Sequence, residues 1–393
     1  MNLKQETLRI HRDLKGKIAT KPKIKISTKK DLSLIYTPGV AEVSKEIAAD
    51  KSRVYEYTMK SNSVAVVTDG SAVLGLGNIG VEAALPVMEG KCVLFKELAD
   101  IDAIPICITS QDENDIISIV KNISTSFGGI NLEDISAPRC FKVEEALQGI
   151  GIPVMHDDQH GSAIVILAAL INAAKVVKKN IEELRVVVNG AGAAGTAVTR
   201  LLLCLSIDKR ICTSVKEIVI CDSKGIIYEG RPNLDAFKLQ LAKVTNKRKR
   251  NGTLKDSLEG ADVFIGVSTG NLLTSNDLKR MSKNAIVFAM ANPVPEILPE
   301  EARKVAAIVG TGRSDYPNQI NNSLAFPGVF RGALDAKAVL INNEMKIAAA
   351  HALANFIKPT KENILPHTLD KNVAKKVAEA VKNAAIETGV VRT

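Results

Sequence analysis

The sequence predicts an α/β protein of two domains, the second with a Rossmann-type, doubly wound parallel sheet. Its 393 residues are long for one core and suit two domains. Residues 54–150 alternate short apolar runs with helical stretches, and residues 185–310 repeat strand and helix patterns around a glycine-rich turn. We therefore expect an N-terminal α/β domain over residues 1–155 and a Rossmann-type domain over residues 156–393.

The composition is that of an ordinary globular protein, with 46% hydrophobic residues. No apolar run reaches the length of about 18 residues that is typical of a membrane span. The first residues, "MNLKQETLRIHRDLKGK", are charged and contain no apolar segment, so they do not resemble a signal peptide. We expect a cytoplasmic protein without a membrane partner.

Two basic runs contribute much of the net charge of +9, namely "KPKIKISTKK" (21–30) and "KRKR" (247–250). Basic runs can bind nucleic acid. However, the chain has no Trp and only 4% aromatic residues, and neither run lies in a recognisable nucleic-acid module. We interpret both as solvated surface that mildly attracts anionic substrates, and expect no nucleic-acid partner.

The six cysteines include no CxxC pair, and most lie within apolar stretches. We expect them to be buried, reduced thiols, which disfavours a zinc–thiolate site. They are Cys92, Cys107, Cys140, Cys204, Cys212 and Cys221.

In the N-terminal half, we expect the first ~30 residues to form a helix followed by an extended arm. The apolar runs "SVAVVT", "KCVLFK" and "AIPICI" are predicted as strands, so Lys91 would stand at the start of a strand. "DENDIISIVKNIS" has the pattern of a helix. A longer apolar helix is predicted over 162–179, with Ser162 as its N-cap.

The second half contains a succession of βα units, which predicts a parallel sheet. Its strands are expected at 185–189, 217–221, 262–267, 285–290 and 306–310. The last helices, expected at 342–357 and 370–387, should pack back across the cleft between the domains.

The glycines of "GAGAAG" (190–195) form a GxGxxG motif between a strand and a helix. This motif allows a tight turn, a close approach to a pyrophosphate and a helix N-terminus that attracts phosphates. Asp222 follows the next strand, where a carboxylate accepts ribose hydroxyls. Asp222 favours NAD over NADP, although Lys224 keeps NADP open. The predicted cofactor-binding residues are Gly190, Gly192, Ala193, Ala194, Gly195, Asp222, Ser268, Thr269 and Asn292. A second glycine-rich stretch, "GLGNIG" (75–80), lacks a good preceding strand and is interpreted as a structural turn.

Two acidic pairs flank apolar segments. "HDDQH" (156–160) superficially resembles a zinc-protease motif. However, Gly161 follows directly, so we predict a loop in which His156 and His160 need not share a face. Glu133 and Asp134 form the other pair. Together with Asp157 or Asp158 they offer three oxygen ligands, which suit Mg²⁺ or Mn²⁺ better than zinc. Each pair alone is also compatible with a solvated turn.

Several stretches, in the same order, resemble the signature motifs of malic enzymes of the compact bacterial type. The resemblance spans roughly residues 30–335, and nothing resembles the phosphotransacetylase-like extension of some bacterial members. The stretches are "YTPGV" (36–40), "VTDGSAVLGLGNIG" (67–80), "GKCVLFKELADIDAIPI" (90–106), "NLEDI" (131–135), "HDDQHGSA" (156–163), "GAGAAG" (190–195), "FAMANPVPE" (288–296) and "GTGRSDYPNQINNSLAFPG" (310–328).

This resemblance implies oxidative decarboxylation of L-malate to pyruvate and CO₂, with NAD or NADP and with Mg²⁺ or Mn²⁺. The N-terminal domain would then hold substrate and metal. By resemblance, Tyr36 is the general acid, Lys91 the general base and Asp157 the carboxylate that orients the lysine. Glu133, Asp134 and Asp158 match the metal ligands, and Asn292 and Asn322 match the asparagines on the substrate and nicotinamide side.

One position departs from the larger family members, in which an Arg follows "TDG" by two residues and holds a malate carboxylate. This chain has Ala72 there, so another group must hold that carboxylate. Two other readings are a metal-dependent oxaloacetate decarboxylase without a redox step and a non-catalytic dinucleotide sensor. The extended arm and the family likeness also predict a homodimer in which the arms exchange, so that Tyr36 serves the partner's active site.

Overall fold

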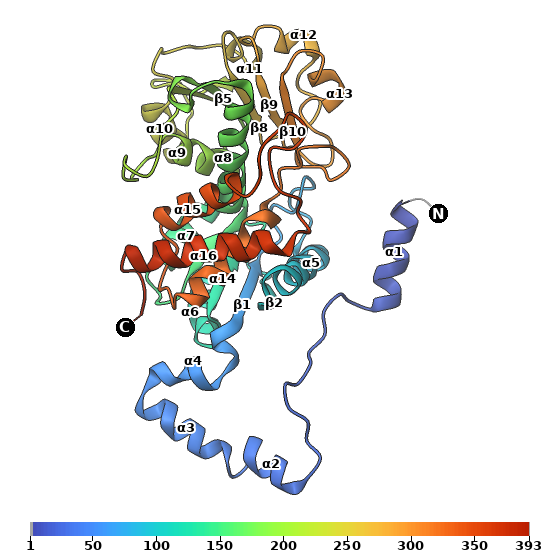
Figure 1. Cartoon of the computed structure of the whole chain (residues 1–393), viewed down its shortest axis with the longest axis vertical. Coiled ribbons are helices and arrows are strands. Elements are labelled where there is room, and N and C mark those ends of the chain that lie inside the picture. The colour runs from blue at the N-terminus through green and yellow to red at the C-terminus, as the bar shows by residue number, and fades with distance from the viewer. Residues whose placement is uncertain (1–2, 393) are drawn as a thin grey trace.

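The computed structural model describes residues 3–392 and contains two parallel sheets (Figure 1). The first sheet has the strand order β2-β1-β3-β4, and all of its pairs are parallel. Its strands are β1 (Ser63–Thr68), β2 (Asp102–Cys107), β3 (Gly129–Leu132) and β4 (Val154–His156). Helices α5 (Val81–Ala99), α6 (Glu113–Ile123) and α7 (Arg139–Leu147) connect these strands.

The second sheet has the order β10-β9-β8-β5-β6-β7, parallel except for the short β7. Strand order reverses at β5, which lies between β8 and β6, so this is a doubly wound sheet with a switch point beside β5. The strands are β5 (Arg185–Asn189), β6 (Glu217–Asp222), β7 (Gly225–Ile226), β8 (Val263–Gly266), β9 (Ile286–Ala289) and β10 (Ile308–Thr311). The predicted α/β class and the five predicted strands of this sheet are confirmed.

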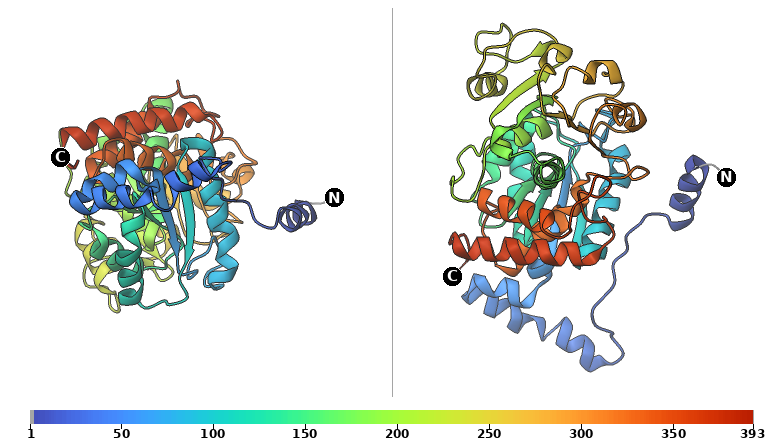
Figure 2. Two further views of the ribbon diagram at one scale, coloured as in Figure 1. Left: turned by 90° about the horizontal axis from the view of Figure 1, so that it is seen from below. Right: turned by 45° about the horizontal axis from the view of Figure 1, so that its top comes forward.

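Helices cover the second sheet and return the chain to the first. They are α8 (Asp157–Val177), α9 (Ala193–Leu202), α10 (Ala236–Val244), α11 (Leu254–Ser257), α12 (Ser275–Leu278), α13 (Pro299–Ala302), α14 (Phe326–Asp335), α15 (Asn343–Ala354) and α16 (Lys371–Glu387). Helices α14 and α16 pack against α5, and α15 packs against α8 (Figure 2). Phe95 on α5 meets Phe326 and Phe330 on α14 edge to face, with ring centroids 4.7 and 5.5 Å apart.

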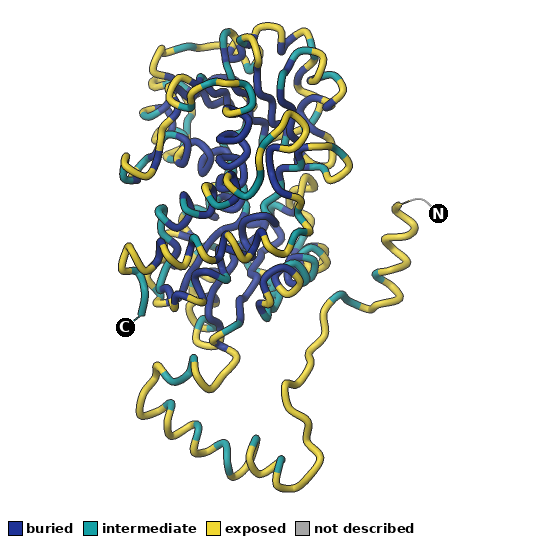
Figure 3. Tube along the Cα trace, viewed as in Figure 1, coloured by how far each residue is buried: buried dark blue, intermediate teal, exposed yellow. Residues whose placement is uncertain are grey.

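The N-terminal segment leaves the body of the protein. Helix α1 (Leu3–Leu14), an extended stretch, α2 (Lys29–Ile35), α3 (Val40–Ala49) and α4 (Val54–Tyr57) lie outside the two sheets. Figure 3 shows that α1 to α3 are almost entirely exposed, and none of these three helices contains a buried residue. The predicted helix followed by an extended arm is confirmed. The described residues also contain five short 3₁₀ helices: η1 (Lys51–Arg53), η2 (Met59–Asn62), η3 (Ser124–Ser126), η4 (Ile181–Glu183) and η5 (Asn322–Leu324).

The structure corrects the assignment of "KCVLFK" as a strand, because these residues lie within helix α5. The buried residues Ala84, Met88, Cys92, Phe95 and Ala99 recur every three or four positions, which is the period of a helix. Six residues are too few to show this period. Lys91 therefore stands inside a helix, next to a buried residue of the core face.

The structure also corrects the start of the long apolar helix, which begins at Asp157 rather than Ser162. His156 is its N-cap residue, and "DDQH" forms its first turn rather than a loop. Gly161 does not break the helix. A Cβ at this position would lie 1.8 Å from Oδ1 of Asp157, so glycine leaves room for that carboxylate.

Helix α8 also meets the length and hydropathy expected of a membrane span, although no such run was expected. In this protein, 72% of its most apolar 18-residue window is buried inside the structure. Its apolar side chains belong to the central core that joins the two domains.

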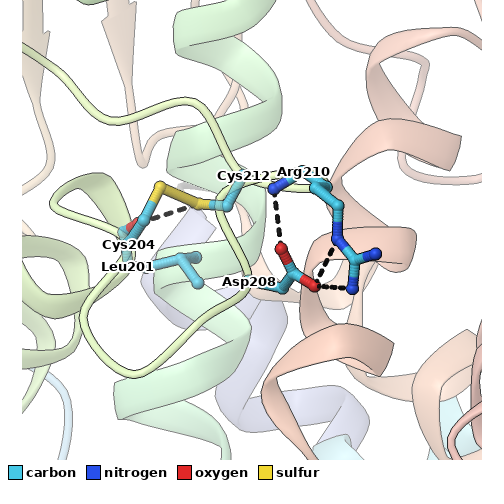
Figure 4. Close-up of a disulfide and its surroundings, with 5 residues drawn as sticks. All are labelled: Leu201, Cys204, Asp208, Arg210 and Cys212. Carbon is cyan, nitrogen blue, oxygen red and sulfur yellow. Dashed lines mark hydrogen bonds and ion pairs between the residues drawn. A yellow bond between two sulfur atoms is a disulfide. The ribbon is translucent and has the colours of Figure 1, made fainter.

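The expectation of six reduced cysteines is wrong for two of them. Cys204 and Cys212 form a disulfide in the loop between α9 and β6 (Figure 4). Asp208 and Arg210 are paired in the same loop, with Arg210 Nε 2.8 Å from Asp208 Oδ2. The disulfide forms because the loop folds back and brings the Cα atoms of Cys204 and Cys212 to 5.9 Å from each other. The two cysteines do not have the CxxC spacing, so the sequence does not indicate this disulfide. Cys92, Cys140 and Cys221 are free and buried, and Cys107 is free and half-buried.

Candidate active site

Four carboxylates meet at one edge of the first sheet. Strand β3 pairs with β4 so that Leu132 lies opposite His156. The residues that follow these two strands therefore emerge side by side at the carboxyl edge of the sheet. One ligand atom each from Glu133, Asp134 and Asp158 lies within 4.8 Å of the others. The backbone N–H of Asp134 donates to Oδ2 of Asp158 over 2.8 Å, which ties the two acidic pairs together.

Lys91 projects from α5 into this cluster. Its Nζ lies 2.8 Å from Oε1 of Glu133 and 2.7 Å from Oδ2 of Asp157, and its side chain is only 8% exposed. The ammonium group also lies 4.4 Å from the centre of the Phe326 ring. Burial by itself lowers the pKa of Lys91, but the charges of Asp157 and Glu133 outweigh burial and raise that pKa above its ordinary value.

The single positive charge of Lys91 does not balance the negative charge of the four carboxylates. Burial is the largest cause that raises the pKa of Asp134 to about 9, that of Asp157 to about 7 and that of Asp158 to about 6, and neighbouring carboxylates add to it. Burial likewise raises the pKa of Glu133. One lysine faces four acids, and Oδ2 of Asp134 is buried without a hydrogen-bond partner. Such a set of hard oxygen donors fits a divalent cation of the Mg²⁺ or Mn²⁺ class.

Neither histidine of "HDDQH" belongs to this carboxylate cluster. Nε2 of His160 lies 2.9 Å from Oε2 of Glu144, and Nδ1 of His156 is 3.8 Å from Oδ2 of Asp158. Burial lowers the pKa of both imidazoles. Within residues 3–392, the clustered donors are therefore carboxylate oxygens without an imidazole or a thiolate.

Asn322 joins the cluster from the loop that precedes α14. It stands in η5 close to Asp157: a Cβ at Gly161 would lie 1.8 Å from Oδ1 of Asp157 and 3.2 Å from Cβ of Asn322. Asn292 follows β9 and lies between two loops. A Cβ at Gly75 would be 1.8 Å from the backbone oxygen of Asn292, and one at Gly312 would be 2.9 Å from its Nδ2. Asn292 thus touches the loop "GLGNIG" of the first domain, which forms a turn as expected.

Tyr36 is not brought to the cluster of its own chain. It is the C-cap residue of α2 and is 64% exposed. Helix α2 lies in the N-terminal arm, away from the carboxyl edge of the first sheet (Figure 1).

The glycine-rich loop lines a cavity of about 780 Å³ at the switch point of the second sheet. The predicted residues Gly190, Gly192, Asp222, Ser268 and Thr269 line it. Ala193 and Ala194 form the first turn of α9, whose N-terminus begins at this loop. A Cβ at Gly195 would lie 1.7 Å from the carbonyl oxygen of Gly190, so only glycine permits this close packing of helix and turn.

The first domain closes one side of this cavity with Ala137, Pro138 and Phe141. The ring of Phe141 on α7 contacts that of Phe237 on α10, with centroids 4.7 Å apart. Glu133 and Asp134 of the acidic cluster precede Ala137 of the cavity wall by only a few residues, so a short stretch of the first domain connects the two.

The carboxylate of Asp222 is already engaged by two cations. Arg231 Nη2 lies 2.5 Å and Lys238 Nζ 3.1 Å from its Oδ2, and the backbone N–H of Lys224 donates to its Oδ1. Burial raises the pKa of Asp222, but these contacts outweigh burial and lower it. The negative charge at this edge of the cavity is therefore compensated, which sequence reasoning did not foresee.

Arg231, Lys238 and Glu144 were missed in the sequence. The sequence spacing between Asp222 and the residues Arg231 and Lys238 does not indicate that they form ion pairs. Glu144 did leave a signal, because Cys140, Val143 and Leu147 mark the buried face of α7 and Glu144 falls on that face.

Comparison with known proteins identifies the family. Residues 15–116 match the family model "Malic enzyme, N-terminal domain", and residues 159–386 match "Malic enzyme, NAD binding domain". The bifunctional malic/malolactic enzyme of Bacillus subtilis (strain 168) is 54% identical over 398 residues, which cover 100% of this chain and 95% of that protein. The NAD-dependent malic enzyme of Geobacillus stearothermophilus is 50% identical over 396 residues, which cover 100% of this chain and 81% of that protein.

A solved structure agrees. The crystal structure of an NAD-dependent malic enzyme from Thermotoga maritima superposes with a TM-score of 0.91 at 51% identity, covering 95% of this chain and 98% of that chain. The chain therefore belongs to the malic enzyme family, whose reaction, oxidative decarboxylation of malate with a nicotinamide cofactor, is the one that the sequence predicted.

Proposed function

We propose that the carboxyl edge of the first sheet binds L-malate and a divalent ion, Mg²⁺ or Mn²⁺, while the cavity of the second sheet binds the nicotinamide cofactor. One observation carries this proposal: buried Lys91 contacts Asp157 and Glu133 beside the carboxylates Asp134 and Asp158. A buried base among metal-type ligands, next to a dinucleotide cavity, suits proton removal coupled to hydride transfer.

In the reaction, Lys91 as the neutral amine would accept the proton of the C2 hydroxyl, and a bound nicotinamide would supply the acceptor for the hydride of C2. Malate and NAD(P)⁺ thus yield CO₂, pyruvate and NAD(P)H. Asp157 holds the Nζ of Lys91 toward the substrate, and Asn322 lies close to Asp157. Glu133, Asp134 and Asp158 would hold the divalent ion, which when bound supplies positive charge for the C2 oxygen and against the carboxylate field around Lys91. Tyr36 protonates C3 after CO₂ has left.

Asn292 and Asn322 are proposed to contact the substrate and the nicotinamide. Asn322 already lies close to Asp157 of the cluster. Asn292 lies where the loop around Gly75 meets the second domain, so it stands at the boundary between the two binding regions. Both are neutral amides, which can donate to a substrate carboxylate without adding charge.

The arrangement of the arm supports a homodimer. Tyr36 is exposed on a segment that lies apart from its own body, whereas Lys91 is buried. We propose that the arm of one protomer reaches the site of its partner, so that each site combines Lys91 from one chain with Tyr36 from the other. Since the most apolar window of α8 is mostly buried inside the protein, we also propose a cytoplasmic enzyme.

The choice between NAD and NADP depends on the edge of the cavity at Asp222. A free carboxylate there would favour NAD by repelling a 2′-phosphate. Arg231 and Lys238 compensate this charge, so we propose that the site also accepts NADP.

The test is absorbance at 340 nm with L-malate and Mn²⁺, with NAD and NADP offered separately and with an EDTA control. Reduced cofactor formed only with metal, together with pyruvate, supports the proposal and ranks the two nucleotides. Absence of signal with both nucleotides contradicts it, and oxaloacetate is then the substrate that tests decarboxylation without a redox step.

A further inference from the structure

Glu144 is a buried carboxylate that holds the beginning of helix α8. It lies on the buried face of α7. Its Oε1 accepts the backbone N–H of His156 over 3.0 Å. Its Oε2 accepts Nε2 of Gln159 over 3.1 Å and lies 2.9 Å from Nε2 of His160. All three partners belong to the N-cap and first turn of α8.

Helix α8 has no cap of its own. Its N-cap residue, His156, makes no side-chain capping hydrogen bond. Helices usually satisfy these first N–H groups with a nearby side-chain oxygen. Here a residue of another helix supplies that oxygen, and its negative charge lies at the positive end of the helix dipole.

Glu144 is ionised in this position. Burial raises the pKa of Glu144, but His160, Lys346 and His156 outweigh burial and lower it to about 2. Lys346 is itself buried, on α15. An ionised buried carboxylate makes stronger hydrogen bonds than a neutral acceptor.

The same helical turn carries the carboxylates of Asp157 and Asp158 on its other side. Successive residues of an α-helix are about 100° apart. Asp157 and Gln159 therefore point in nearly opposite directions, as do Asp158 and His160. Lys91 holds the turn from the side of Asp157, and Glu144 holds it from the side of Gln159 and His160.

We infer that Glu144 is a positioning residue that sets where Asp157 and Asp158 stand, and hence how tightly the acidic cluster holds a divalent ion. The inference rests on the proposed metal site. Its physical basis is that metal ligands must be placed to within about 0.2 Å, which a frayed or rotated first turn cannot maintain. Removing outer groups that orient metal ligands typically weakens metal binding about 10- to 100-fold.

The test is direct Mn²⁺ binding to the purified full-length protein, measured from the EPR signal of free Mn²⁺. Glu144→Gln keeps the size of the side chain but removes the charge and one acceptor. We expect its Mn²⁺ dissociation constant to rise about tenfold, while dinucleotide affinity, measured by calorimetry, stays within about twofold of that of the unmodified protein. An unchanged Mn²⁺ dissociation constant in a folded Glu144→Gln protein overturns the inference.

The matched control is Asn172→Ala, on the same helix. Nδ2 of Asn172 donates to the carbonyl oxygens of Ala354 and Ile364 over 2.8 and 2.9 Å, so its loss destabilises α8 far from the first turn. We expect a lower Tm with unchanged Mn²⁺ binding. An equal loss of Mn²⁺ affinity in Asn172→Ala and Glu144→Gln would show a merely structural role and overturn the inference.

Two further variants make every result decisive. If Glu144→Gln does not fold, Gln159→Leu replaces it, because this change removes one donor to Glu144. We expect the Mn²⁺ dissociation constant of Gln159→Leu to rise a few-fold, and an unchanged value overturns the inference.

Asp158→Asn tests the metal site itself. If it binds Mn²⁺ as the unmodified protein does, the proposed site has failed. If only Asp158→Asn loses Mn²⁺, the site stands and the role of Glu144 has failed.

Discussion

Nζ of Lys91 lies 2.7 Å from Oδ2 of Asp157, and both side chains are buried. The two residues are 66 positions apart and come from α5 and α8. This contact joins the proposed base to the helix that also carries Asp158. The positions of the proposed base and of the proposed metal ligand Asp158 therefore depend on one another, because a shift of α8 moves both.

Replacing Lys91 by Met should remove the base without disturbing the cofactor cavity. We expect kcat to fall by about 10²- to 10⁴-fold, with dinucleotide affinity unchanged in calorimetry. The control is Lys96→Met on the same helix, whose side chain is half exposed and pairs with Asp102 at the surface. A Lys91→Met enzyme that keeps more than about a tenth of kcat would show that Lys91 is not the base.

Exchange of the arms can be tested by mixing two inactive variants, Tyr36→Phe and Lys91→Met. If Tyr36 acts on the partner's site, a mixed dimer contains one intact site and one site that lacks both groups. Random exchange makes half of the dimers mixed, so roughly a quarter of the activity should return. Recovery is measured after co-expression or after dissociation and reassembly. If each chain uses its own Tyr36, no site is intact and no activity returns.

Lys238 should affect NADP more than NAD. It neutralises Asp222 at the edge of the cofactor cavity, and its loss would expose a 2′-phosphate to that carboxylate. We expect Lys238→Ala to lower kcat/KM for NADP about tenfold relative to NAD, which corresponds to about 1.4 kcal/mol. Lys255→Ala is the control, because Lys255 also lines the cavity but pairs with Asp277. Equal changes with both nucleotides in Lys238→Ala would contradict this role.

The sequence predicts those parts of the fold that depend on local pattern. Strand β5 was predicted with its observed bounds, because a buried parallel strand before a glycine-rich turn is a strong local signal. Helix α5 was misassigned in part, since a six-residue window does not show a helical period. Gly161 predicts a loop from its sequence position, whereas in the structure it makes room for the side chain of Asp157, which lies close to it only in the folded helix.

The candidate site was predictable where it follows from strand order. Glu133 and Asp158 meet because each pair of acids follows one of two adjacent parallel strands. The compensation of Asp222 by Arg231, the capping of α8 by Glu144 and the distance of Tyr36 from its own site could not be predicted. Each depends on how separate elements pack. The pattern of α7 indicates that Glu144 is buried, but it gives no local signal that Glu144 contacts α8.

Lys60 provides a test of the structure outside the site. Its Nζ donates to the carbonyl oxygens of Ser124 and Thr125 over 2.7 and 2.9 Å, and it is buried. Burial, assisted by Arg392, lowers the pKa of Lys60 from 10.5 to about 8. Between these two values the unfolded chain binds a proton that the folded protein does not bind, so folding becomes more favourable as the pH rises through this window.

The free energy of unfolding in urea should therefore increase from pH 8 to pH 10.5 in the unmodified protein relative to Lys60→Met, with no relative change below pH 8. Lys121→Met, at an exposed position of α6, should not alter this dependence. If the unmodified protein and Lys60→Met show parallel curves over that range, Lys60 is not desolvated as the structure indicates.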